Sequence, residues 1–175
     1  MKNRLIVPTT REKVMRDEDF IVSKTDLKGR ITYGNRIFQE FSGYAEHELL
    51  GVQHNIIRHP DMPRAAFNLA WNLIKAEQEF FGFVKNLSAD GSFYWVFTHI
   101  TPSYNPQGAV EGYLSVRRKP NTQSIKTIEG LYSQMCDIEK REGPKNGMEV
   151  STRFLLDFLD QQRTTYDELI LALQG

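Results

Sequence analysis

The segment from His54 to Pro63 carries two histidines together with Arg58 and Asp61, just ahead of a predicted helix. A helix start presents unpaired N–H groups and positive potential. Arg58 adds a forked donor that suits phosphate or carboxylate. The segment therefore fits an anionic group such as a pyrophosphate. The alternative is a solvated loop in which Asp61 only caps the helix.

A second group of residues is aromatic and falls mostly between Phe67 and Phe97. Flat rings that face one another across a cleft can hold a planar cofactor. An ordinary aromatic core is the alternative. The rings concerned are Phe67, Trp71, Phe80, Phe81, Phe83, Trp95 and Phe97.

Two asparagines have both a structural and a functional interpretation. Asn86 interrupts an apolar predicted strand, where an amide costs free energy unless it is hydrogen-bonded. Its donor and acceptor suit a heterocycle, and a bond to backbone explains it equally well. Asn35 follows a predicted strand and is either a turn residue or a ligand contact.

The remaining reactive side chains do not form a catalytic set. His99, in a predicted strand, and His47, in a short predicted helix, are each either a haem ligand or a structural residue. Cys136 is the single cysteine and is predicted to be inert. The motifs GxGxxG, GxxxxGKS/T and GxSxG are absent, and no nucleophile has a base at suitable spacing. The chain is therefore not predicted to be an enzyme.

The composition is that of a folded globular protein. Of 175 residues, 40% are hydrophobic and 25% charged, with 22 Lys and Arg against 22 Asp and Glu. Zero net charge argues against nucleic-acid binding. The sequence has no secretory signal and no apolar run near the roughly 20 residues that cross a bilayer. We therefore expect a cytoplasmic protein.

Periodicity and turn residues predict an α+β fold. The order is two strands, several short helices, one longer helix and three strands, which favours a five-stranded antiparallel sheet with short helices on one face. Sheet and helices then form a half-open cup. The predicted strands are 20–24, 30–33, 80–87, 92–101 and 110–118, and the predicted helices between them are 36–41, 45–50 and 61–76. The last strand has Val110, Gly112, Leu114 and Val116 on one face and mostly polar groups on the other.

Both ends of the chain add segments to this fold. Residues 1–19 form an N-terminal cap, in which Thr9 or Thr10 caps a short predicted helix that reaches residue 19. Residues 20–120 form the main domain. Residues 121–175 form a helical extension, with a helix over 121–142, a linker over 143–147 and a last helix capped by Ser151.

Several motifs occur together in a specific order between residues 20 and 120. They are NRIF at 35–38, SGY at 42–44, HN at 54–55, RHPDMP at 58–63, VKN at 84–86, YWV at 94–96 and SVR at 115–117. In this order they resemble the PAS domains of bacterial aerotaxis receptors. The resemblance implies a PAS fold that binds FAD in the cup and senses redox state or oxygen.

The resemblance also implies roles for individual residues. It places Arg58, His59 and Asp61 beside the phosphate, ribose or adenine of FAD, Trp71 against the ring system, and Asn86 in a hydrogen bond to the isoalloxazine. The full set expected at the cofactor is Asn35, His54, Arg58, His59, Asp61, Phe67, Trp71, Phe80, Asn86 and Trp95. Phe80 stands where the family usually has a tryptophan. FMN is the alternative to FAD.

The family's membrane segments, HAMP region and signalling coiled coil do not match anything in this chain. We therefore expect it either to signal to a protein partner through the helices at 121–142 and 151–173, which also suit a homodimer, or to be a fragment of a longer protein. Two alternatives differ in class. One is a haem-based gas sensor that uses His99 or His47 as ligand, and the other is a cofactor-free interaction module whose cup is filled by side chains.

Overall fold

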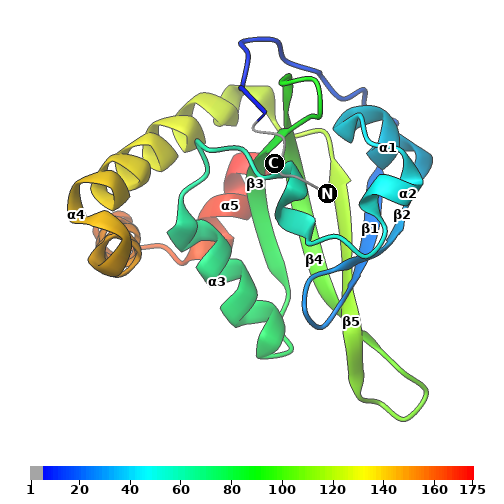
Figure 1. The fold of residues 1–175 in the computed structure, drawn as a ribbon. Helices are drawn as coiled ribbons and strands as arrows, with labels where there is room; N and C mark the ends of the chain where they lie inside the picture. Colours follow the sequence, from blue (N-terminus) through cyan, green and yellow to red (C-terminus); the bar gives the residue numbers. More distant parts are fainter. Residues whose placement is uncertain (1–5) are drawn as a thin grey trace.

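A five-stranded antiparallel sheet forms the centre of the computed structural model, which describes residues 6–175 (Figure 1). Its strand order is β2-β1-β5-β4-β3. The strands are β1 (Ile21–Asp26), β2 (Ile31–Gly34), β3 (Phe80–Leu87), β4 (Phe93–Tyr104) and β5 (Val110–Arg118). The predicted α+β class and the antiparallel sheet are therefore confirmed.

The turn between β1 and β2 was predictable from its sequence because its residues form the turn through local contacts. The Asp26 carboxylate accepts hydrogen bonds from the backbone N–H groups of Lys28 and Arg30, each at 2.9 Å. The backbone φ of Gly29 is +76°, a value that residues with a side chain rarely adopt. A Cβ at Gly29 would lie 2.8 Å from the Trp71 ring. The turn glycine is thus required both by its backbone and by the helix that packs on it.

One face of the sheet is covered by the elements between β2 and β3. They are α1 (Arg36–Ser42), α2 (Glu46–Leu49), a 3-10 helix η1 (His54–Ile57) and α3 (Arg64–Lys75) (Figure 1). Buried side chains such as Phe38, Leu49 and Ile57 pack with Ile21 and Val96 of the sheet. The short helices therefore close the cup, as predicted.

The start of α3 differs from the prediction that Asp61 caps it. The cap residue is Pro63, which has no side-chain donor or acceptor to offer. The buried carboxylate of Glu139, from α4, accepts hydrogen bonds from the backbone N–H groups of Arg64 and Ala65, each at 2.9 Å. A distant part of the chain thus satisfies the N–H groups at this helix start.

The C-terminal arm, residues 122–174, consists of α4 (Thr122–Gln162) and α5 (Tyr166–Gln174). The predicted linker at 143–147 is wrong, because the chain bends at Gly143 alone (φ +74°) and Pro144 resumes the helix. Ser151 is buried within this second half rather than capping it. The helix ends at Gln162, followed by Arg163 in a left-handed conformation, and Thr165 caps α5. The bend returns the chain toward the sheet, where α5 lies beside β3 (Figure 1).

The predicted helix at 9–19 is also wrong. The N–H of Thr9 donates to the Gly91 carbonyl at 2.7 Å, and the N–H of Lys13 donates to the Phe93 carbonyl at 2.8 Å. This segment has few apolar anchors, so pairing with the β3–β4 hairpin satisfies its backbone better than an isolated helical turn would. Within residues 6–175, every helix is too short or too polar to span a bilayer.

Replacing Glu139 by Ala tests how far α3 depends on the C-terminal arm. The change leaves two backbone N–H groups and Nε of Arg64 without their acceptor, while the rest of the Arg64 guanidinium keeps the carbonyls of Gly143 and Pro144. We expect the free energy of unfolding to fall by about 1–3 kcal/mol. The control is Glu149→Ala, which removes an exposed ion pair with Arg153 on the same helix and should cost at most about 1 kcal/mol. Equal losses in urea unfolding of the two variants would contradict the capping role.

Candidate functional site

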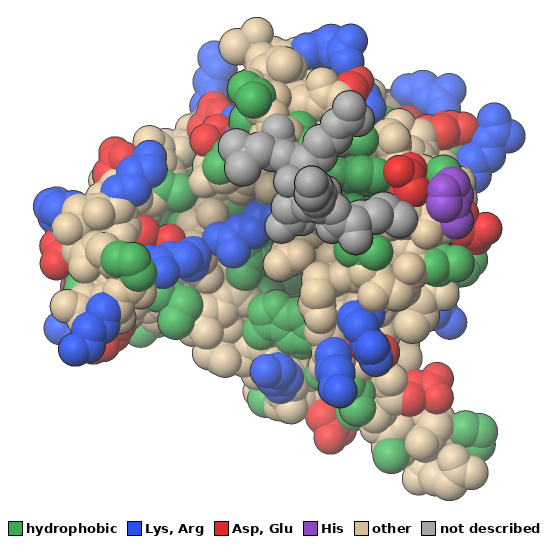
Figure 2. Space-filling view, in the orientation of Figure 1, with side chains coloured by type: hydrophobic (Ala, Val, Ile, Leu, Met, Phe, Trp, Pro, Cys, Tyr) green, Lys and Arg blue, Asp and Glu red, His purple; other side chains and the backbone are tan. Residues whose placement is uncertain are grey.

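A cavity of about 300 Å³ lies between the sheet and α3. This is at the small end of the roughly 300–1,000 Å³ found for ligand pockets. Figure 2 shows hydrophobic side chains in the middle of the face that it draws, with basic side chains on both sides of them. Residues from β1, β3, β4, β5, α3, the segment 53–58 and α4 line the cavity. The expected cup therefore encloses space that side chains do not fill.

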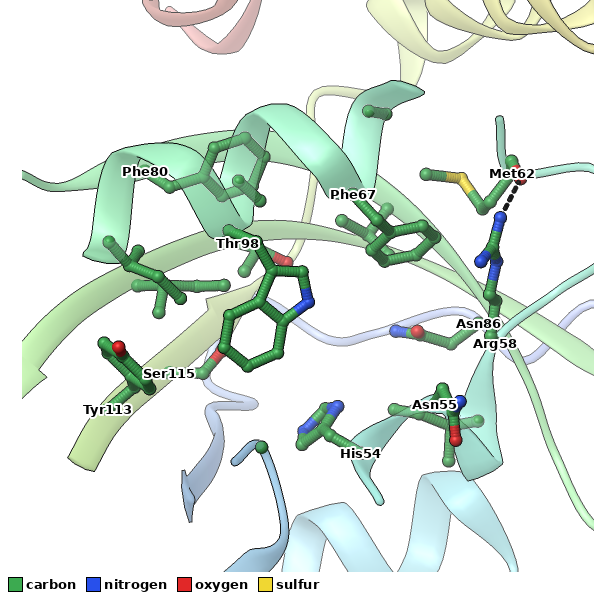
Figure 3. A pocket seen from close by; sticks show the side chains of 18 of the residues that line it. His54, Asn55, Arg58, Met62, Phe67, Phe80, Asn86, Thr98, Tyr113 and Ser115 are labelled. Atoms are coloured by element: carbon green, nitrogen blue, oxygen red, sulfur yellow. Dashed lines mark hydrogen bonds between the residues drawn. The ribbon is translucent and has the colours of Figure 1, made fainter. Parts of the chain in front are cut away.

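The apolar wall comes mainly from α3 and β3. Phe67 and Trp71 are four residues apart on α3 and so share one face of the helix. The Trp71 ring meets the edge of Tyr113 from β5, with ring centroids 5.7 Å apart. Phe80 lines the cavity from the start of β3, and the close-up shows it together with Phe67 (Figure 3). Three expected residues thus lie together around one space.

Polar atoms without partners face the same cavity. Asn86 and Thr98 are 4% and 3% exposed and both line it. Neither Asn86 Nδ2 nor Thr98 Oγ1 has a hydrogen-bond partner in the described part of the chain. The Asn86 amide points into the open space in Figure 3. Buried polar groups are normally paired, so these two atoms require an explanation.

Arg117 is a third such residue, and the sequence analysis did not single it out. It is 2% exposed, lines the cavity from β5, and its Nη1 has no partner within residues 6–175. Tyr113, Ser115 and Arg117 alternate along β5, so the polar face of this strand is the cavity face. The sequence showed only that Arg117 shares the polar face of a predicted strand with Tyr113 and Ser115.

His54 lies against Arg117. Its Nε2 is 2.7 Å from Arg117 Nη2 and 3.0 Å from Ser23 Oγ, and its ring stacks on Phe38. Burial, and then the charge of Arg117, lower the pKa of His54 from 6.5 to about 3. The imidazole is therefore neutral at ordinary pH, and Nε2 accepts the hydrogen bond from the guanidinium.

Arg58 also lines the cavity. Its Nη2 donates to the Met62 carbonyl at 3.1 Å (Figure 3), and its guanidinium lies over the Phe67 ring, 4.6 Å from the centroid. Burial lowers the pKa of Arg58 from its usual value. This leaves further N–H donors of a cation available at the cavity wall.

His59 and Asp61 lie outside the cavity lining, contrary to the expectation that both adjoin a cofactor. His59 is buried, and its Nδ1 accepts the N–H of Asp61. The Asp61 carboxylate pairs with Lys85 Nζ at 2.8 Å, and Lys85 also reaches Glu129 of α4. These charges connect β3 to the C-terminal arm.

Two further expected residues have structural roles. Asn35 caps α1, because its Oδ1 accepts the N–H groups of Phe38 and Val22 while its Nδ2 donates to the Phe20 carbonyl. Trp95 points away from the cavity and packs against Tyr132 of α4. The strand alternates, and Thr98 takes the cavity side of β4. Neither residue lines the cavity.

The start of α3 is not free to bind an anion either. Its first N–H groups already hold the carboxylate of Glu139, so the predicted pyrophosphate site at this helix start is wrong. Of the residues expected at the cofactor, the structure brings six to the cavity: His54, Arg58, Phe67, Trp71, Phe80 and Asn86.

A model of the PAS fold matches residues 31–117, which contain these six residues. The chain contains a PAS domain. It is 37% identical over 127 residues to the aerotaxis receptor of Escherichia coli (strain K12), a match that covers 73% of this chain and 25% of the receptor. It is also 34% identical over 97 residues to a nitrogen fixation regulatory protein of Klebsiella pneumoniae, covering 55% of this chain and 20% of that protein.

Among solved structures, light-oxygen-voltage domains share the fold of this PAS domain. One, described with a flavin analogue, has a TM-score of 0.55 and 24% identity, covering 62% of this chain and 82% of that one. The light-state LOV domain of Aureochrome1 has a TM-score of 0.56 and 20% identity, covering 65% and 90%. The chain thus spans a quarter of the aerotaxis receptor and most of these isolated domains.

The protonation of His54 tests the electrostatics of the site. Because its folded-state pKa of about 3 lies below 6.5, only the unfolded chain binds this proton between those values. The contribution of His54 to the free energy of unfolding is therefore fully present above pH 6.5, and it is lost as the pH falls toward 3. We expect its NMR resonances to stay those of a neutral ring from pH 8 down to about 5. A titration step near 6.5 would contradict the buried contact with Arg117.

Proposed function

We propose that this chain is a sensor of redox state or oxygen that binds FAD in the cavity between the sheet and α3. One observation carries the proposal: Asn86, Thr98 and Arg117 each have a buried polar atom without a partner in residues 6–175, and all three line a cavity with a largely aromatic and aliphatic wall. An unpaired buried donor or acceptor costs about 1–3 kcal/mol. A planar heterocycle with several acceptors and donors on its edge fits both features.

The aromatic wall supports a ring system as ligand. Phe67 and Trp71 offer flat faces at helical spacing, and such faces stack on planar heterocycles. The Asn86 amide carries both a donor and an acceptor. It can therefore bond to a ring nitrogen that carries a proton and, after turning, to one that does not. A bound flavin supplies electron transfer, and the residues of this chain bind and orient it.

We infer that the flavin is FAD rather than FMN. This inference is supported by the match to the aerotaxis receptor and by Arg58, which has spare donors for a phosphate at the cavity wall. The phosphate is not assigned to the start of α3, because the N–H groups there bind Glu139.

The haem alternative has less support in the geometry. His99 pairs with Glu79 and stacks on Phe81, and His47 is exposed on α2. Neither residue lines the cavity, and the imidazole of His54, which does, is engaged by Arg117. A cofactor-free module would leave the three cavity-facing polar groups unpaired, which is costly.

Contacts at the cavity support signal transfer to the C-terminal arm. Tyr132 of α4 lines the cavity, and its hydroxyl donates to the Phe83 carbonyl of β3 at 3.0 Å. Glu139, seven residues later on the same helix face, caps α3. A change at Asn86 on β3 or Trp71 on α3 therefore reaches α4 through two separate contacts. We propose that this arm passes the state of the flavin to a protein partner in the cytoplasm.

The absorption spectrum of the purified protein tests the cofactor. We expect flavin bands, FAD as the released compound, and affinity at least about tenfold weaker in Asn86→Ala because the ring loses its amide partner. The control is Asn72→Ala, which makes the same change on the exposed face of α3 and should bind FAD as the unchanged protein does. A protein without flavin bands that takes up no added FAD would overturn the proposal.

Hydrogen exchange of α4 tests the route of the signal. We expect amide exchange over residues 128–139 to differ between the protein with oxidised FAD and the same protein reduced by dithionite. Tyr132→Phe should diminish this difference, because it removes the bond to β3, while Gln134→Ala on the exposed face should leave it unchanged. Identical exchange in both redox states would refute transmission through α4.

A further inference from the structure

Arg117 is a buried cation without an anionic partner. Its side chain is 2% exposed, and it forms no ion pair with a carboxylate anywhere in residues 6–175. A buried charge without a partner costs several kcal/mol. Proteins retain such a charge where a ligand or a function compensates for it.

The groups that surround the guanidinium are neutral. Its Nε donates to Ser115 Oγ at 3.1 Å, and its Nη2 contacts Ser23 Oγ and the unprotonated Nε2 of His54. Tyr94 of β4 is buried nearby, and burial raises the pKa of its phenol, so it supplies no negative charge at neutral pH. Burial lowers the pKa of Arg117 only to about 10, so its charge persists.

Arg117 also contributes to the wall of the cavity. Nη1 has no partner in the described residues, and Arg117 belongs to the cavity lining together with Ser115 and Asn86. The opposite wall, with Phe67 and Trp71, is aromatic. The cavity therefore has a cation at the β5 end, separate from Arg58 beside Phe67, and a face that suits a ring.

We propose that Arg117 makes this cavity selective for aromatic ligands that carry negative charge at the β5 end, and that it favours reduced over oxidised flavin there. The second half rests on the proposed function. Two electrons from a donor such as dithionite, taken up with one proton, leave the flavin ring with one negative charge. A fixed cation at the ring edge lowers the free energy of that state.

The first experiment needs no flavin. It compares the anionic dye 8-anilinonaphthalene-1-sulfonate with neutral N-phenyl-1-naphthylamine, which has the same rings without the sulfonate, as ligands of the cofactor-free protein. We expect Arg117→Gln to weaken binding of the anionic dye by about tenfold and of the neutral dye by less than about twofold. Arg118→Gln is the matched control, because the next side chain along β5 is exposed. Equal effects on both dyes would overturn the proposal.

Ser115→Asp provides a second variant in case Arg117→Gln unfolds the protein. It places a carboxylate beside the Arg117 guanidinium, where the serine hydroxyl now accepts its Nε–H. We expect this internal partner to abolish the preference for the anionic dye. An unchanged preference would contradict the assignment of that preference to Arg117.

The second experiment measures the reduction potential of the bound flavin. We expect Arg117→Gln to lower it by about 30 mV or more, which for two electrons is a tenfold change in the ratio of reduced to oxidised affinity. The control Arg118→Gln should leave it unchanged. If flavin binds and the potential does not move in Arg117→Gln, the redox half is wrong. If the two dyes are discriminated and no flavin binds, the proposed function fails and the anion selectivity of Arg117 stands.

Discussion

The interior of this PAS domain contains buried polar groups that have no hydrogen-bond partner within residues 6–175. Asn86, Thr98 and Arg117 come from three neighbouring strands and face one cavity. Water-excluded donors of this kind are costly, so a fold that retains three of them around an aromatic-walled space implies an occupant with matching acceptors. The sheet fixes their spacing, and α3 supplies the facing wall with Phe67 and Trp71.

The second organising contact joins that wall to the C-terminal arm. A helix start attracts negative charge, and here the charge is the carboxylate of Glu139 from the chain itself. The N–H groups at the start of α3, which could bind a phosphate, thus bind Glu139 and hold α4 against α3. Because Tyr132 on the same helix lines the cavity, the arm and the cavity share contacts. In the proposed function, these shared contacts pass a change in the ligand to the arm without a long path through the domain.

Local patterns in the sequence predicted the sheet and most of the cavity wall. Strand alternation and turn residues act over a few positions, and the motifs around Trp71 and Asn86 locate the wall residues by family resemblance. Long-range partners were not predictable in this way. The sequence near Arg64 gives no sign that Glu139, 75 residues later, caps α3. Asp61 has the sequence position of a helix cap, and only the structure shows that it pairs with Lys85 instead. Arg117 was overlooked because a polar strand face reads equally well as solvent-exposed.

Stability as a function of ligand concentration tests the central claim most directly. A compound that binds only the folded protein stabilises it by RT ln(1 + [L]/Kd), which approaches about 1.4 kcal/mol for each tenfold increase above Kd. Chemical unfolding of the cofactor-free protein at increasing FAD concentration should show this slope, with one molecule bound per chain at saturation. An unfolding free energy that stays constant at millimolar FAD would mean that the cavity does not hold this ligand.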